Sequence, residues 1–82
     1  MSWNHRVIAS KEHHLNGKTE IVFSIHEVYY DKDGVPDVYT KNPIRISSDS
    51  IEGMKWTLYR MQECLTKPVL WAEPNFPKEY EL

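Results

Sequence analysis

The sequence is poor in cysteine and glycine, and each shortage excludes certain kinds of protein. The single cysteine, Cys64, cannot form a disulfide within the chain, and no Cys and His spacing typical of a zinc site surrounds it. The three glycines, at positions 17, 34 and 53, are too scattered to form a phosphate-binding loop. We therefore expect a protein of the cytoplasm that uses no cofactor.

The sequence also lacks long apolar runs and clusters of one charge. No stretch approaches the ~20 apolar residues of a membrane span, and the first ten residues contain no apolar run typical of a secretion signal. Ten Lys and Arg residues are scattered among twelve Asp and Glu residues, for a net charge of −2. Nucleic acids and anionic membranes bind clustered basic residues, so we expect neither as a partner.

The length of 82 residues is enough for one small domain, which we expect to be only marginally stable. We predict that residues 1–71 form a single α+β domain. Two prolines and three glutamates interrupt any periodicity in residues 72–82, AEPNFPKEYEL, so we predict a weakly ordered acidic tail there.

Asn16-Gly17 predicts a hairpin between two strands, because both residues tolerate the positive φ of a two-residue turn. With such a turn, residues whose numbers sum to 33 face each other, although a bulge near residues 11–14 would shift this register by one. The predicted pairs are Trp3 with Tyr30, His5 with Val28, Arg6 with Glu27, and Ile8 with Ile25.

A second turn is predicted by DKDG at residues 31–34, where Gly34 would take the left-handed conformation. The third strand would cover residues 37–46, and Pro36 and Pro43 favour a short strand or one at an edge. These three strands would form an antiparallel meander with residues 21–30 in its centre.

The segment that follows, up to Pro68, has the pattern of a helix. Ser48 or Asp49 would cap its beginning. Apolar residues recur in it at spacings of three and four and so form one stripe, which we expect to pack on the sheet. The stripe consists of Ile51, Met54, Leu58, Met61 and Leu65. The predicted fold is α+β, with a three-stranded antiparallel meander packed on one C-terminal helix, β-β-β-α, in two layers.

The adjacent residues His26 and Glu27 suggest a catalytic or metal-binding pair. Neighbouring side chains in a strand point to opposite faces, so the two cannot act together on one substrate or one metal ion. We expect Glu27 to pair with Arg6 on the exposed face and His26 to be a hydrogen-bonded, partly buried histidine.

Other signatures of catalysis and metal binding are also incomplete. The acidic residues that begin at Asp31 miss the spacing of a calcium loop, and Cys64 has no histidine near it in sequence. We therefore expect no enzyme, no catalytic residue and no metal site. A small metal-dependent protein stays open as an alternative, because imidazoles suit transition metals. Its candidate ligands are His5, His13, His14 and His26.

Aromatic residues give the strongest functional pattern. At 100° per residue, Trp56, Tyr59 and Glu63 lie on the helix face away from the apolar stripe, with Arg60 beside them. Trp and Tyr are frequent anchors of protein interfaces, so this face is a candidate protein-binding surface. The alternative is that residues 68–76, PVLWAEPNF, fold back and cover the tryptophan.

A second candidate protein-binding surface is the sheet face opposite the predicted helix. One helix can cover only one face of a three-stranded sheet, and large side chains would collect on the other. These are Trp3 and Tyr30, with His5, Val28 and Tyr39.

Residues 2–70 resemble a group of short bacterial proteins of unassigned function. The likeness rests on a W-N-x-R start at residues 3–6, on IHEVYY at residues 25–30 and on the helix ending LTKPVL. It implies a compact bacterial domain and no particular activity, cofactor or site residue. In pattern only, the chain is also distantly similar to the partial RNase H-like N-terminal domain of HicB antitoxins, although no DNA-binding motif is recognisable after it.

These observations predict a small bacterial protein that binds another protein through its aromatic surfaces, with a homodimer as one form of that binding. A HicB-like antitoxin or regulator is the alternative that the distant similarity implies.

Overall fold

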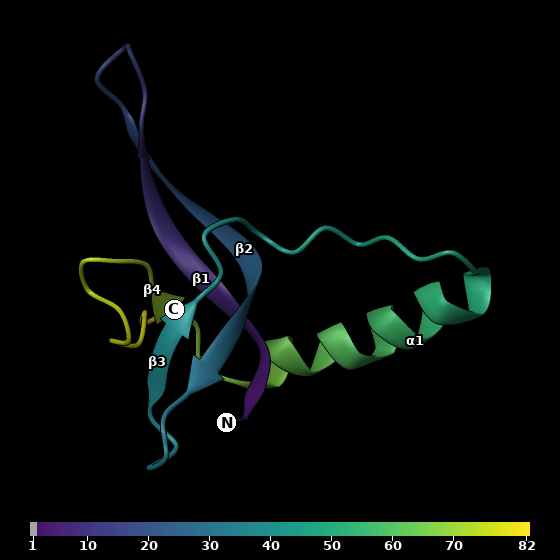
Figure 1. Ribbon diagram of the computed structural model, residues 1–82. Helices are drawn as coiled ribbons and strands as arrows, with labels where there is room; N and C mark the ends of the chain where they lie inside the picture. Colours follow the sequence, from purple (N-terminus) through teal and green to yellow (C-terminus); the bar gives the residue numbers. More distant parts are fainter. Residues whose placement is uncertain (1) are drawn as a thin grey trace.

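The computed structural model describes residues 2–82 and shows a curled, four-stranded mixed sheet with one α-helix (Figure 1). The elements are β1 (Trp3–His13), β2 (Thr19–Tyr30), β3 (Pro36–Tyr39), α1 (Ile51–Met61), the 3-10 helix η1 (Gln62–Thr66) and β4 (Leu70–Trp71). The strand order is β3-β2-β1-β4. β2 pairs antiparallel with both β1 and β3, whereas β4 runs parallel to β1.

The predicted fold, a three-stranded antiparallel meander packed on one helix in two layers, is therefore wrong. The parallel strand β4 adds Leu70 opposite Ile8 and Trp71 opposite Ala9. A strand of two residues carries no period that a sequence pattern can reveal, which is why the sequence does not predict it. The helix also differs, because α1 projects away from the sheet and does not cover it (Figure 1).

The β1–β2 hairpin has a longer loop than the predicted two-residue turn. The Gly17 N–H donates to the His14 carbonyl at 3.0 Å, and the His14 N–H donates to the Lys18 carbonyl at 2.9 Å. Three residues thus form the loop, and the last of them, Gly17, has a φ of 84°. A type I turn followed by one left-handed residue is a common three-residue hairpin loop.

The longer loop shifts the register by one residue, so the numbers of facing residues sum to 32. Each of the four predicted pairs is therefore wrong. The observed pairs are Trp3 with Tyr29, His5 with Glu27, Arg6 with His26, and Ile8 with Ser24. A shift of one residue moves side chains to the opposite face relative to their neighbours, so Trp3 and Tyr30 lie on different faces of the sheet.

β3 ends at Tyr39 and is shorter than the strand predicted over residues 37–46. The chain continues along β2 after this point, since the Ile44 N–H donates to the Ile25 carbonyl at 2.8 Å. Pro43 has no N–H to donate, and the regular ladder does not extend to it.

The core lies on both faces of the sheet, because β1 is buried from Arg6 to Ala9 without alternation. We call the two sides the Val7 face and the Ile8 face. The buried residues of the Val7 face are Val7, Ala9, Cys64 and Val69. Those of the Ile8 face are Ile8, Val28 and Leu70.

Residues 72–82 lie against the sheet and contact both faces. Tyr80 packs against the core of the Val7 face, and Phe76 against that of the Ile8 face. The Trp71 N–H donates to the Lys78 carbonyl, and the Tyr80 N–H to the Val69 carbonyl, each at 2.8 Å. The weak order predicted for this segment stays a prediction.

Helix α1 is capped by Ser50, and the predicted caps Ser48 and Asp49 are wrong. The Ser50 Oγ accepts a hydrogen bond from the Gly53 N–H at 2.9 Å, as Ser at an N-cap commonly does. A Cβ at Gly53 would collide with the Ser48 Oγ, which explains why a glycine fits this position in the first turn.

The apolar stripe of the helix is mostly exposed, contrary to prediction. Ile51, Leu58 and Leu65 are 72%, 48% and 73% exposed, and only Met61 of the stripe is buried. The α-helix ends at Met61, and the tighter 3-10 turn of η1 then directs Cys64 into the core in place of Leu65.

Arg6 is a buried cation, 7% exposed, on the Ile8 face. Its Nη1 donates to the Tyr30 hydroxyl at 2.7 Å, and its Nη2 donates to the Pro68 carbonyl at 2.7 Å. Its Nε has no hydrogen-bond partner among the described residues. The predicted Arg6–Glu27 ion pair is wrong, because the register sets the two side chains on opposite faces.

We expect Arg6→Ala to lower the free energy of unfolding by about 2–4 kcal/mol. The change leaves the Pro68 carbonyl and the Tyr30 hydroxyl without their donor and opens a cavity where the buried Arg6 side chain was. Urea denaturation followed by circular dichroism measures the loss. Arg45→Ala, which removes an exposed arginine, is the control and should cost less than about 0.5 kcal/mol. Equal losses for the two variants would contradict the structural role of Arg6.

Candidate functional site

Two tryptophans from distant parts of the chain hold one arginine between them. The Arg60 Cζ lies 5.3 Å from the centre of the Trp3 ring and 5.1 Å from the centre of the Trp56 ring. A guanidinium over an aromatic face within about 6 Å is attracted by the ring quadrupole. We call this arrangement the Trp–Arg–Trp stack.

The fold explains why these three residues meet. Trp3 begins β1, and the C-terminal end of α1 returns to the sheet beside that point (Figure 1). Trp56 and Arg60 are four residues apart on α1, so their side chains share one side of the helix. The stack thus joins the exposed side of α1 to the start of the sheet.

His5 extends the stack along β1. Its ring lies edge-on to the Trp3 ring, with centres 5.4 Å apart and planes at 83°. Burial lowers the pKa of His5 below its usual 6.5; the carboxylates of Glu27 and Glu63 oppose this shift, and the positive charge of Arg60 adds to it. The imidazole is therefore held in its neutral form by its surroundings at neutral pH.

Glu27 lies on the same Val7 face and is hydrogen-bonded to Tyr29, two residues further along β2. The Tyr29 hydroxyl donates to the Glu27 Oε1 at 2.8 Å. This hydrogen bond to the carboxylate, together with burial and the negative charge of Glu27, raises the pKa of Tyr29 above 10.0. Glu27 therefore pairs with a tyrosine and not with Arg6 or His26.

A second stripe runs along α1 and into η1, away from the apolar one. Glu52, Trp56, Tyr59 and Glu63 follow each other at spacings of four, three and four residues, and all four are exposed. We call it the aromatic stripe. Trp56 is 61% exposed and Tyr59 is 74% exposed. The segment of residues 68–76 lies at the sheet and leaves Trp56 uncovered.

The structure brings four of the five predicted protein-binding residues to one region. Trp56, Tyr59 and Glu63 share the aromatic stripe, and Trp3 joins them through the Trp–Arg–Trp stack. Tyr30 lies apart on the Ile8 face, where its hydroxyl accepts from Arg6 and donates to the Asn4 Oδ1 at 2.8 Å. That environment gives Tyr30 a structural role in the sheet.

The sequence pattern places Arg60 beside the aromatic residues but does not predict its central position in the Trp–Arg–Trp stack. Its place beside Trp56 follows from the four-residue spacing, but its contact with Trp3 depends on where the helix meets the sheet. No local signal predicts that meeting, since 56 positions separate the two residues in sequence.

His26 is a buried histidine with two hydrogen bonds, as predicted, and points away from the face of Glu27. Its Nδ1 lies 2.8 Å from the Thr40 carbonyl, which only accepts, so Nδ1 carries the proton. The Nε2 lies 2.9 Å from the Ser24 Oγ. The Thr40 bond ties β2 to the segment after β3, and the Ser24 contact lies within β2.

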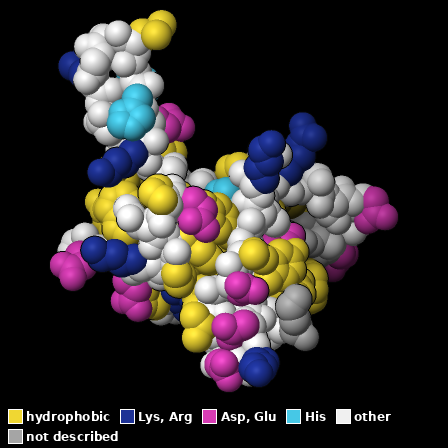
Figure 2. Space-filling view, turned by 60° about the vertical axis from the view of Figure 1, so that its left-hand side comes forward, with side chains coloured by type: hydrophobic (Ala, Val, Ile, Leu, Met, Phe, Trp, Pro, Cys, Tyr) yellow, Lys and Arg dark blue, Asp and Glu magenta, His cyan; other side chains and the backbone are white. Residues whose placement is uncertain are grey.

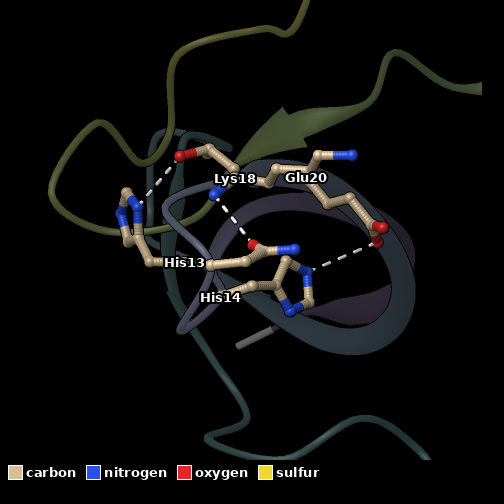
Figure 3. Close-up of polar contacts among 6 residues, drawn as sticks. His13, His14, Lys18 and Glu20 are labelled. Carbon is tan, nitrogen blue, oxygen red and sulfur yellow. Dashed lines mark hydrogen bonds and ion pairs between the residues drawn. The ribbon is translucent and has the colours of Figure 1, made fainter.

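The two histidines at the hairpin tip point to different sides of the loop (Figure 3). The His13 Nδ1 lies 3.1 Å from the Thr19 Oγ1, and the His14 Nε2 lies 3.8 Å from the Glu20 Oε2. Among residues 2–82, no three His, Cys, Asp or Glu side chains gather as possible ligands of a metal ion.

An apolar groove separates α1 and η1 from β2. Two adjoining hollows, of about 350 Å³ and about 180 Å³, share Ile25 and Leu65 in their walls. Phe23 lines the first hollow, and Ile46 and Leu58 line the second. The exposed apolar stripe of the helix is thus one wall of the groove, and the Val7 face of β2 is the other.

Charges of both signs are interspersed over the surface drawn in Figure 2, where the hairpin arm stands clear of the rest of the molecule. Hydrophobic side chains gather on the body of the domain in the same view. This face therefore offers no extended surface of one charge.

Comparison with models of known protein families, with curated proteins and with solved structures gave no match to this chain. The resemblance to short bacterial proteins and the distant similarity to HicB antitoxins therefore stay predictions. The same holds for an antitoxin-like role and for a metal-dependent one.

None of the helices in residues 2–82 has the length and apolar character needed to cross a membrane.

The pKa of His5 offers a direct test of this site. We expect Arg60→Gln to raise it, because the change removes a nearby positive charge, and Glu63→Gln to lower it further, because a negative charge is lost. NMR titration of the imidazole protons measures both shifts. Arg45→Gln should leave the His5 titration unchanged. A decrease in the pKa with Arg60→Gln would contradict the arrangement of the stack.

Because the pKa of His5 is lower in the folded chain than in the unfolded one, the unfolded chain takes up its proton first as the pH decreases below 6.5. The contribution of His5 to stability is therefore fully present above pH 6.5 and declines below it.

Proposed function

We propose that this chain is a protein-binding module that uses the aromatic stripe of α1. The observation that carries the proposal is the exposure of Trp56 and Tyr59, side by side on a helix whose C-terminal end is fixed to the sheet. Large exposed aromatic side chains are characteristic of interface anchors.

The Trp–Arg–Trp stack supports this role because it fixes the Trp56 side chain before a partner binds. Arg60 holds the Trp56 ring on one side, so less side-chain freedom is lost when a partner packs on the other side. Tryptophan also combines a large apolar surface with an N–H donor, which suits a partly wet interface.

The charges of the stripe favour a partner segment that carries Lys or Arg together with apolar side chains. Glu52 and Glu63 stand at the two ends of the stripe, in the first turn of α1 and the first turn of η1, with the aromatic rings between them. Basic side chains of a partner would meet these carboxylates, and an apolar or cationic side chain would pack on the rings.

The proposal requires neither a cofactor nor a catalytic residue, and it assigns no role to nucleic acids or membranes. His26 and Ser24 are explained by the hydrogen bonds that they make inside the sheet. The cytoplasm is the compartment that we propose, with the one cysteine, Cys64, buried as a free thiol in the Val7 face.

Selection of a displayed peptide library against the purified chain tests the proposal. We expect the enriched peptides to carry Lys or Arg beside apolar residues. The double change Trp56→Ala with Tyr59→Ala should weaken their binding at least about tenfold, because it removes both anchors. Affinity should also decrease with added salt and with Glu63→Gln.

Leu15→Ala is the control, since it removes an exposed apolar side chain in the β1–β2 loop, outside α1. It should leave peptide affinity unchanged. Enriched peptides that bind the Trp56 and Tyr59 variant as tightly as the unchanged chain would refute the role of the aromatic stripe.

A further inference from the structure

We propose that a second copy of this chain covers the apolar groove, so that the protein acts as a symmetric homodimer joined through α1 and the Val7 face of β2. This inference concerns the opposite side of α1 from the aromatic stripe and does not depend on the proposed function. The surface involved comprises Phe23, Ile25, Ile46, Ile51, Leu58 and Leu65.

The first argument is the open shape of the single chain. The 9.7 kDa chain exposes 6368 Å², whereas the scaling for compact monomers gives roughly 5,100 Å² at that mass. Its radius of gyration is 14.1 Å, against about 12 Å for a compact domain of this length. The excess surface of about 1,200 Å² is shared between the projecting hairpin and the open groove, and a standard stable interface buries roughly 800 Å² per partner.

The second argument is the composition of the uncovered surface. An amphipathic helix in a small domain normally buries its apolar stripe, because most of its stability comes from that packing. Here Leu58 and Leu65 extend over an open groove whose opposite wall, Phe23 and Ile25, is also apolar. Two apolar surfaces that would normally pack against each other are therefore both exposed in the single chain.

The third argument is that the surface complements itself. Ile51 and Leu58 lie seven residues apart on α1, with Met54 between them, which is the spacing of an interhelical seam. Leu65 follows in η1 and lines the same groove. A two-fold axis beside α1 would place this ridge of one copy in the groove of the other, and the reverse. Each copy supplies one ridge and one groove.

The fourth argument is charge. About a two-fold axis, equivalent side chains come close to one another, so a charge near the axis meets a like charge and weakens the dimer. At 100° per residue, the neutral side chains of Thr57 and Gln62 border the stripe on its two sides, and Lys55 lies next to Gln62, whereas Glu52 and Glu63 stand on the aromatic stripe. A two-fold axis on the Thr57 side of the stripe therefore keeps the two Lys55 side chains of a symmetric dimer apart.

Sedimentation equilibrium of the unchanged chain decides the question without any substitution. We expect a mass near 19 kDa, twice the 9.7 kDa of one chain, at tens of micromolar. A mass that stays at 9.7 kDa up to several hundred micromolar protein overturns the proposal. This holds whether α1 of the monomer packs on its own sheet or stays exposed.

The site of contact is tested by Leu58→Glu and Leu65→Glu. A carboxylate in a desolvated interface lacks a partner, so each change should raise the dimer dissociation constant at least about 100-fold. Leu65 is 73% exposed in the single chain, so its replacement should leave the circular dichroism spectrum unchanged.

Leu15→Glu is the matched control, because Leu15 is fully exposed in the loop of the β1–β2 hairpin, whose tip projects away from α1 (Figure 1). It should keep the mass near 19 kDa. A dimer that survives Leu65→Glu, or that dissociates equally with Leu15→Glu, refutes the groove as the interface. The variant with Trp56→Ala and Tyr59→Ala should remain dimeric, which separates this result from that of the peptide experiment.

Discussion

The rest of the structure depends on the burial of β1 on both of its faces. From Arg6 to Ala9 every side chain is inside, so the sheet needs cover on two sides, and a chain of 82 residues has little material to provide it. The Val7 face receives Cys64 from η1, and the Ile8 face receives Tyr39 and Phe76. Both covers are small, and α1 adds only Met61 to the buried residues. The central strand thus uses the residues that follow α1 for packing and leaves the apolar stripe of the helix mostly exposed.

A helix that is not needed for the core is available for contacts with other molecules. The two sides of α1 differ in chemistry: one carries aromatic rings between carboxylates, and the other carries aliphatic side chains over an apolar groove. The Trp–Arg–Trp stack fixes the base of the helix to the sheet, so both surfaces keep a defined orientation. The two proposed contacts use opposite sides of the same helix, so dimerisation and partner binding would not compete for one surface.

Local patterns in the sequence predict the hairpin position, the helical segment and the opposite orientations of His26 and Glu27, because each depends on residues that are close in sequence. The register fails by one residue, since Asn16-Gly17 fits both a two-residue and a three-residue loop and only the flanking strands decide between them. Because of that single shift, Tyr30 and Trp3 lie on opposite faces of the sheet, and so do Arg6 and Glu27. β4 and the position of α1 depend on contacts between distant segments. The aromatic residues of the helix follow from periodicity alone, whereas the Trp3–Arg60 contact does not.

The two outermost strands have a consequence for how copies of the chain can assemble. β3 has four residues and begins with a proline, and β4 has two, with Leu70 bridged on its outer side to Glu79. Backbone donors and acceptors are therefore scarce along β3 and β4 themselves, and strand addition at these two strands finds few groups to bond to. β1 and β2 extend well beyond these short partners, so the projecting hairpin is the part of the sheet whose edges remain open to pairing with another strand.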